Sequence, residues 1–103
     1  MDAVEDVKQF LRGQNLEQLG RRDEAIGIYE EIVAQGFDSI GPYDRLITIY
    51  SSRSLHDDVV RISELALANV HTYEEKRDFY AQTKEAALRA ASDVPKAAPK
   101  RRA

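Results

Sequence analysis

The side chains in this sequence best suited to bind a metal ion are the histidines His56 and His71. His56 is followed directly by Asp57 and Asp58, so three potential ligands stand in a row. Neighbouring residues on a helix point in different directions, however, and zinc ligands usually stand in pairs one turn apart. We therefore predict no metal site and no cofactor, and we expect both aspartates to interact with the positive end of a helix dipole.

Three serines, Ser51, Ser52 and Ser54, are the next candidates for chemistry because a hydroxyl can act as a nucleophile. A serine nucleophile needs a histidine base in a suitable arrangement, and no histidine stands in a recognisable nucleophile motif with these three. We expect their hydroxyls to cap backbone groups at a helix end instead. The five glycines do not form a phosphate-binding loop, because they are scattered along the chain. We predict no catalytic residue and no enzymatic activity.

The composition is that of one small globular domain. The chain has 103 residues, of which 43% are hydrophobic and 32% charged. The absence of cysteine excludes a disulfide framework and a thiolate zinc site. The first residues, MDAVEDVKQF, are acidic where a secretory signal is basic and then apolar, and no apolar stretch reaches about 18 residues. We expect a cytoplasmic protein without a membrane segment.

Charge is distributed unevenly along the chain. Four of the 15 basic residues stand in the last eight positions, at Lys96, Lys100, Arg101 and Arg102. The other 11 face 18 acidic residues, so residues 1–95 carry a formal charge of −7 and the remainder +4. An acidic body repels a phosphate backbone, and we therefore predict no strong binding of nucleic acid by it.

Apolar residues recur at helical spacing through nearly the whole sequence, and no segment shows the alternation of a β-strand. We expect Gly20 and Gly36 to end helices, Pro42 to stand in the first turn of another, and Pro95 to end the last. The predicted helices cover residues 3–19, 22–35, 42–53, 56–69 and 73–92.

Two residue pairs have the spacing of a capping box, in which each side chain binds a backbone N–H of the first turn. They are Asp2 with Glu5, and Thr72 with Glu75. The segment 93–103 has little apolar bulk to bury and is basic, so we predict a disordered tail after a domain that spans residues 1–92.

Comparison of the sequence with itself shows a repeat at a shift of 34 residues. Under this shift the letters DEAI at 23–26 fall on DDVV at 57–60, and Gly20 falls on Ser54. The pattern acid, acid, apolar, apolar therefore opens two successive helices. Each repeat is expected to be an antiparallel helix hairpin, which needs a neighbour to bury both of its faces.

The segment 13–32 resembles the tetratricopeptide repeat. In that family a small residue lets the paired helices approach, a large apolar residue follows it, and a glycine makes the turn. A second small residue and an aromatic residue then pack in the hairpin. The matching positions here are Gly13, Leu16, Gly20, Ala25 and Tyr29, followed by Ile32.

The second repeat matches the family more loosely. Its aromatic and leucine positions hold Tyr43, Leu46 and Tyr50, and Ala66 occupies the late small position. The departures from the family pattern are Ile47, Ser54, Val59 and Ser63. The resemblance implies an all-α fold, with two hairpins and a C-terminal capping helix stacked as a right-handed superhelix.

The resemblance also implies a concave groove that holds an extended peptide or a partner helix. Its positions in this sequence are Phe10, Gln14, Glu17, Asp44, Arg45, Thr48, Ser51, Asp78 and Gln82. Because Glu17, Asp44 and Asp78 are acidic, we expect a ligand of basic or mixed charge. The lysines and asparagines that clamp acidic chaperone tails in one subfamily are missing here, apart from Arg45.

We therefore predict a non-catalytic protein–protein interaction module, an adaptor or scaffold. A homodimeric assembly unit is the alternative, because two hairpins and a cap are fewer than the roughly three repeats that such stacks need. The apolar residues that could mediate this self-association are Leu65, Leu67 and Phe79, with Phe37 and Ile40 in a connection. A third alternative is a nucleic-acid-associated adaptor acting through residues 96–102, which could also reach the groove of a second copy.

Overall fold

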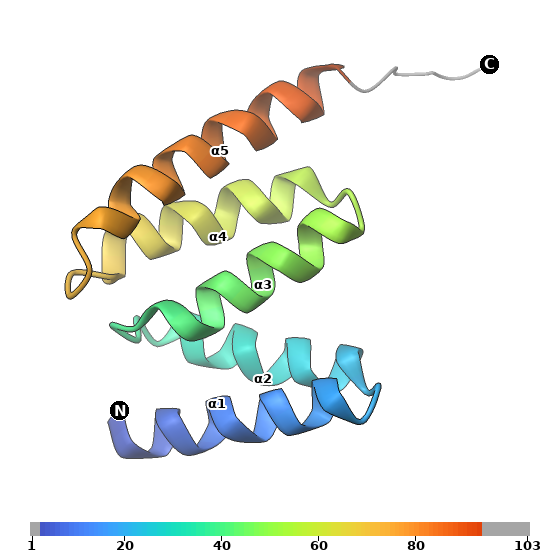
Figure 1. Ribbon diagram of the computed structural model, residues 1–103, viewed down its shortest axis with the longest axis vertical. Helices are drawn as coiled ribbons and strands as arrows, with labels where there is room; N and C mark the ends of the chain where they lie inside the picture. Colours follow the sequence, from blue (N-terminus) through green and yellow to red (C-terminus); the bar gives the residue numbers. More distant parts are fainter. Residues whose placement is uncertain (1–2, 94–103) are drawn as a thin grey trace.

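The computed structural model describes residues 3–93, and these residues form five α-helices and no strand (Figure 1). The predicted all-α class is confirmed. The helices are α1 (Ala3–Gln18), α2 (Arg22–Ala34), α3 (Ile40–Ser52), α4 (His56–Asn69) and α5 (Glu75–Asp93). Each helix packs against the one before it and reverses its direction, so the chain zigzags from α1 to α5 (Figure 1).

The predicted capping box at Asp2 and the predicted tail from 94 onward lie outside the described residues. Asp93, which was predicted to begin the tail, is the last residue of α5. None of the helices within residues 3–93 is long and apolar enough to cross a membrane.

Helix α3 begins at Ile40, two residues before the predicted start. Pro42 is therefore the third residue of the helix instead of the first. The first turn of a helix tolerates proline because its N–H groups have no partner within the helix. The prediction placed the start at the proline itself and missed that the turn already includes Ile40 and Gly41.

Helix α5 begins at Glu75, two residues after the predicted start, and the segment before it is held by another connection. The backbone N–H groups of His71 and Thr72 donate to Asp38 Oδ1, at 2.8 and 3.4 Å. Asp38 belongs to the connection between α2 and α3, so the two connections on this side of the stack are joined to each other. These two bonds hold residues 71 and 72 in the connection that precedes α5.

The turns α1–α2 and α3–α4 have the same conformation although their sequences differ. Gly20 has a positive φ of 78°, and Ser54, which stands 34 residues later, has a φ of 57°. The N–H of Gly20 donates to the carbonyl of Glu17 at 3.0 Å, and that of Ser54 donates to the carbonyl of Ser51 at 3.1 Å. Left-handed backbone is costly for a residue with a Cβ, so Ser54 adopts a conformation that suits glycine better.

The core runs through the interior of the stack and is built mainly by α2, α3, α4 and α5. Tyr29, Tyr43 and Tyr80 are among its largest fully buried side chains, and Phe10 and Leu16 of α1 pack against it partly exposed. Helical spacing of these residues gives each helix one buried face. The buried residues of this cluster are Ala25, Tyr29, Val33, Tyr43, Leu46, Ile47, Ile49, Tyr50, Val59, Ile62, Ala66, Val70, Tyr80 and Ala87.

Positions 34 residues apart hold different combinations of small and large residues. Gly13 on α1 lies against the Tyr29 ring of α2. The residues 34 positions later, Ile47 on α3 and Ser63 on α4, are both buried.

Candidate functional site

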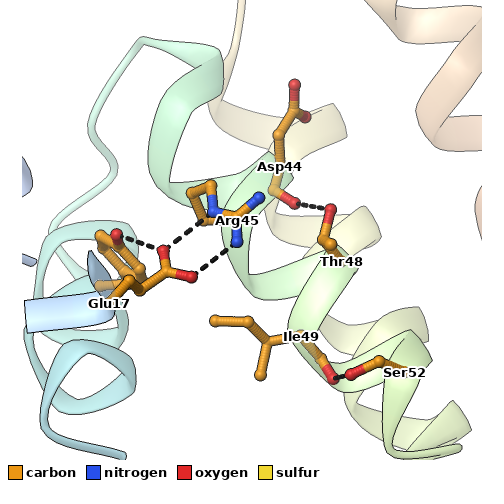
Figure 2. A network of polar contacts seen from close by, with 7 residues as sticks. Glu17, Asp44, Arg45, Thr48, Ile49 and Ser52 are labelled. Atoms are coloured by element: carbon orange, nitrogen blue, oxygen red, sulfur yellow. Dashed lines mark hydrogen bonds and ion pairs between the residues drawn. The ribbon is translucent and has the colours of Figure 1, made fainter. Parts of the chain in front are cut away.

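A three-residue polar cluster joins α1, α2 and α3 (Figure 2). Arg45 of α3 donates from Nε to Glu17 Oε1 at 2.9 Å and from Nη2 to Oε2 at 2.6 Å. The hydroxyl of Tyr29 donates to the same Glu17 carboxylate at 2.7 Å. The hydrogen bonds from Arg45 lower the pKa of Glu17 although burial opposes them, so the carboxylate stays ionised. Two predicted groove residues, Glu17 and Arg45, are thus brought together and bind each other.

Asp44 makes the corresponding connection between α3 and α5. It accepts a hydrogen bond from the Tyr80 hydroxyl at 2.8 Å, and its other oxygen lies 3.0 Å from Lys76 Nζ. Burial raises the pKa of Tyr80, and the hydrogen bond to Asp44 raises it further. The hydroxyl of Thr48 donates to the backbone carbonyl of Asp44 one turn away, at 2.9 Å (Figure 2). Side-chain bonds therefore join α1, α3 and α5 to one another.

A polar hollow of about 250 Å³ lies between α1 and α3. It is lined by Gln14, Glu17, Gln18 and Arg45. Since Glu17 and Arg45 bind each other, the two glutamine amides are the groups left to donate and accept hydrogen bonds there.

A second hollow of about 290 Å³ lies where α3 ends, α4 begins and the second half of α5 passes. Ser51 of α3 and Thr83 of α5 are its hydroxyl-bearing residues, and most of its remaining wall is apolar. Its lining residues are Ser51, His56, Val59, Thr83, Ala86, Ala87 and Ala90.

Besides Asp44 and Thr48, three predicted groove residues line neither of these two hollows. The ring of Phe10 is 5.7 Å from that of Tyr29, and a Cβ on Gly41 would stand 2.6 Å from its Cζ. Phe10 is therefore a packing residue between α1, α2 and α3. Asp78 is exposed on α5, and Gln82 lines a shallow depression formed by α5 residues alone.

The residues predicted for self-association differ in exposure. Leu65 and Leu67 are partly buried and pack against the core, as does Ile40. Phe79 is 43% exposed, with Lys76 Nζ 3.9 Å from its ring centroid and the Tyr80 ring edge-on at 5.4 Å. Only Phe79 thus offers a substantial apolar surface from this group.

Most residues of the repeat signature are buried where helices meet. Leu16 is partly buried, and the exposed Gly20 provides the left-handed turn. The buried ones are Gly13, Ala25, Tyr29, Ile32, Tyr43, Leu46, Tyr50 and Ala66.

Sequence reasoning missed Gln18, Lys76 and Tyr80, and also the residues of α4 and α5 that line the second hollow. Gln18 follows Gln14 by four positions, so helical spacing alone could have placed both in the same hollow. Lys76 and Tyr80 stand 32 and 36 residues from Asp44, and no local pattern indicates that they converge on it.

The polar groups of this face do not include an assembled metal site among the residues from 3 to 93. No group of three or more His, Cys, Asp or Glu side chains within that range could hold a metal ion. The acidic residues that open α2 and α4 stand in the first turns, and two of them, Asp23 and Asp58, pair with Arg53 and Arg61.

No protein-family model matches the chain, and no curated protein or solved structure matches it at a significant level.

Proposed function

We propose that this chain is a non-catalytic protein-interaction module, in which two tetratricopeptide-like hairpins are closed by α5. The face formed by α1, α3 and α5 holds an extended peptide or a partner helix. The observation that carries this proposal is the pair of bridges Glu17–Arg45 and Asp44–Tyr80, which join three non-consecutive helices through their side chains. Helices held in this way present a preorganised surface, which lowers the entropic cost of binding.

The 34-residue period supports the repeat part of the proposal. The same turn geometry occurs at Gly20 and Ser54. Gly13 lies against Tyr29, and the residues 34 positions later, Ile47 and Ser63, are both buried. Stacked hairpins need these positions to be equivalent in shape, and they do not need them to hold the same residue.

The bridges also change the charge that a ligand meets. Glu17 and Asp44 are paired with Arg45 and Lys76, so two of the three acidic groups expected to attract a basic ligand are neutralised. Asp78 is exposed and has no ion-pair partner within residues 3–93. A fitting ligand has one basic group for Asp78, with polar and apolar groups elsewhere.

The two hollows add a preference for neighbouring side chains. The glutamine amides of the first hollow suit a peptide backbone or a polar side chain. The alanines of the second hollow suit a small apolar side chain, because they leave room without offering hydrogen bonds. The proposed ligand is therefore a peptide of mixed character, with apolar and basic residues.

A phage-displayed library of random peptides tests this proposal directly. Peptides selected on the full chain should bind in solution and be enriched in basic and apolar residues. Ala86→Arg fills the second hollow and should weaken the binding of the selected peptides at least about tenfold. Ala34→Arg is the matched control, because it places the same side chain at an exposed position of α2, outside the proposed face.

A second pair of variants tests the charge. Asp78→Lys should weaken the binding of basic peptides. Glu31→Lys, at an exposed position of α2, should leave their binding unchanged. The proposal is wrong if the selected peptides bind the Ala86→Arg and Ala34→Arg variants equally well, or if the library yields no binder.

A further inference from the structure

Three side chains lie around the end of Lys76. Its ammonium group is 3.0 Å from Asp44 Oδ2, 3.9 Å from the centroid of the Phe79 ring and 5.4 Å from that of the Tyr80 ring. A carboxylate and the faces of aromatic rings are groups that bind cations in proteins. We call Asp44, Phe79 and Tyr80 the cation site, and Lys76 is the residue that occupies it.

The groups of the cation site are held in place by one another. The Tyr80 ring is fully buried, and its hydroxyl donates to Asp44 Oδ1 at 2.8 Å. The Phe79 ring meets the Tyr80 ring edge-on, with the centroids 5.4 Å apart. The Asp44 carboxylate points away from Arg45 (Figure 2). None of these contacts involves Lys76, so the site keeps its shape when the lysine leaves.

The contacts of Lys76 are ones that a flexible side chain gives up easily. The side chains of Lys76 and Asp44 are 23% and 31% exposed, so water reaches both. An ion pair at this exposure adds little to stability, because water screens the charges and the lysine loses rotamer freedom. Lys76 is also the second residue of α5, where the helix dipole disfavours a positive charge. Removing the lysine should therefore cost the fold little.

We propose that the cation site binds an arginine side chain of the peptide ligand, and that Lys76 occupies the site until this arginine displaces it. The proposal rests on the peptide-binding function above, because the arginine is part of that peptide. Exchange of one ammonium for another gains nothing. A guanidinium is planar and weakly hydrated, and it stacks on an aromatic ring while its N–H groups donate to a carboxylate. The site should therefore prefer arginine to lysine.

The attachment of Lys76 to the same chain makes the site selective. A tethered group competes at a high effective concentration, so a free cation displaces it poorly. Phe79 stands four residues before Thr83, which lines the second hollow, so the ring and the hollow share one side of α5. A peptide docked in that hollow holds its arginine close to the site and gains the same advantage as the lysine. The site thus admits arginine from a ligand that also fits the neighbouring hollow.

Lys76→Ala empties the site, so single amino acids can test it. The probes are Nα-acetyl-arginine amide and Nα-acetyl-lysine amide, titrated into the full chain at constant ionic strength. The NMR signals of the Phe79 and Tyr80 rings report the binding. Lys76→Ala should bind the arginine probe at least about threefold more tightly than the wild type does, and more tightly than it binds the lysine probe.

Lys84→Ala is the matched control for the loss of a lysine. Lys84 is also on α5 and pairs with a carboxylate, that of Glu64 at 3.1 Å, which is not part of the cation site. Probe binding by Lys84→Ala should equal that of the wild type. Phe79→Leu in the Lys76→Ala chain keeps an apolar side chain but removes the ring, and it should abolish the gain. Circular dichroism checks that each variant remains folded.

Three outcomes would overturn the proposal. They are equal binding of the arginine probe by Lys76→Ala and Lys84→Ala, equal binding of the two probes by Lys76→Ala, and a gain that persists in the Phe79→Leu chain. The probe carries one side chain and does not need the two hollows, so its failure to bind leaves the peptide-binding function standing. A library without binders would contradict that function, and the probes would still measure the cation site.

Discussion

Gly13 and Tyr29 lie so close that a Cβ atom on Gly13 would stand 2.5 Å from Cε1 of the tyrosine ring. The ring is held there on both sides. Its hydroxyl donates to Glu17, and the Phe10 ring lies 5.7 Å from it. The glycine is thus required by a close approach between α1 and α2 and not by its backbone conformation.

Gly13→Ala should therefore destabilise the protein, by about 1–3 kcal/mol, although alanine is the better helix former. Gly27→Ala is the matched control, because no atom lies within 4 Å of a Cβ built at Gly27. That substitution should stabilise α2 by about 0.5–1 kcal/mol. Urea unfolding followed by circular dichroism measures both, and equal effects of the two substitutions would contradict the close contact.

Ser63→Ala should stabilise the second hairpin. Ser63 is fully buried, and its hydroxyl has no hydrogen-bond partner within residues 3–93. Removing a buried hydroxyl without a partner should raise the free energy of unfolding by about 1 kcal/mol or more. Ser52→Ala provides the comparison, since the Ser52 hydroxyl donates to the Ile49 carbonyl at 2.7 Å and its loss should bring no gain. A loss of stability in Ser63→Ala would contradict the absence of a hydrogen-bond partner for Ser63 among these residues.

Ser54→Gly should also stabilise the protein, for a backbone reason. Ser54 has a φ of 57°, which is unfavourable for a residue with a Cβ, and glycine relieves this by about 1 kcal/mol. The reciprocal change Gly20→Ser, at a φ of 78°, should destabilise by a similar amount. Thermal unfolding of the two variants should show shifts of opposite sign.

Tyr80→Phe should lower the free energy of unfolding by about 1–2 kcal/mol and weaken the packing of α5. It removes the hydroxyl of a buried ring, and that hydroxyl donates to Asp44. Tyr73→Phe is the control, as its ring is 42% exposed. Hydrogen exchange should show faster opening of α5 in Tyr80→Phe, with α2 unchanged. Uniform acceleration across all five helices would mean that α5 cannot open separately.

Stability should fall in alkaline solution. Burial raises the pKa of Tyr43 to about 12, and burial together with a carboxylate partner raises the pKa of Tyr29, Tyr50 and Tyr80. An unfolded tyrosine ionises near a pKa of about 10, so the unfolded chain releases these protons first. The stabilisation is complete below about pH 10 and is lost as pH rises toward the folded values. Tyrosinate absorbance and helicity should change together; ionisation of all tyrosines in a still helical chain would contradict this.

Stability should also fall in acid, for the opposite reason. Arg45 holds the pKa of Glu17 below its usual value, so this stabilisation is present above the unfolded pKa of about 4.3 and is lost as pH falls through the folded one. In Glu17→Gln, the free energy of unfolding should fall less steeply with decreasing pH over this range. An unchanged profile would show that other carboxylates dominate it.

The positions of the helices could be predicted because the signals that set them are local. Helical spacing of apolar residues, the left-handed Gly20 and the acidic first turn at Asp23 and Glu24 all act within a few positions. The starts of α3 and α5 were each wrong by two residues. Before α5, the backbone of His71 is bound by Asp38, which belongs to a different connection.

Several residues of the candidate face could be predicted, but the pairing of its charged side chains with one another could not. Glu17, Asp44 and Arg45 were placed on it by the resemblance to a repeat family. That Arg45 binds Glu17 depends on how closely α1 and α3 approach, across 28 residues of sequence. Phe10 was expected to contact a ligand, but the Phe10 ring fills the space that Gly41 leaves because it has no side chain.

The zigzag order of the stack has a consequence for how the chain folds. Each helix packs mainly against its immediate neighbours, so most contacts join residues close in sequence. Chains with such local contacts close short loops and fold quickly. The first hairpin can form its contact between Gly13 and Tyr29 as soon as α2 has been synthesised, and each later helix then adds to a surface that already exists. Folding can thus follow the order of synthesis without waiting for the last helix.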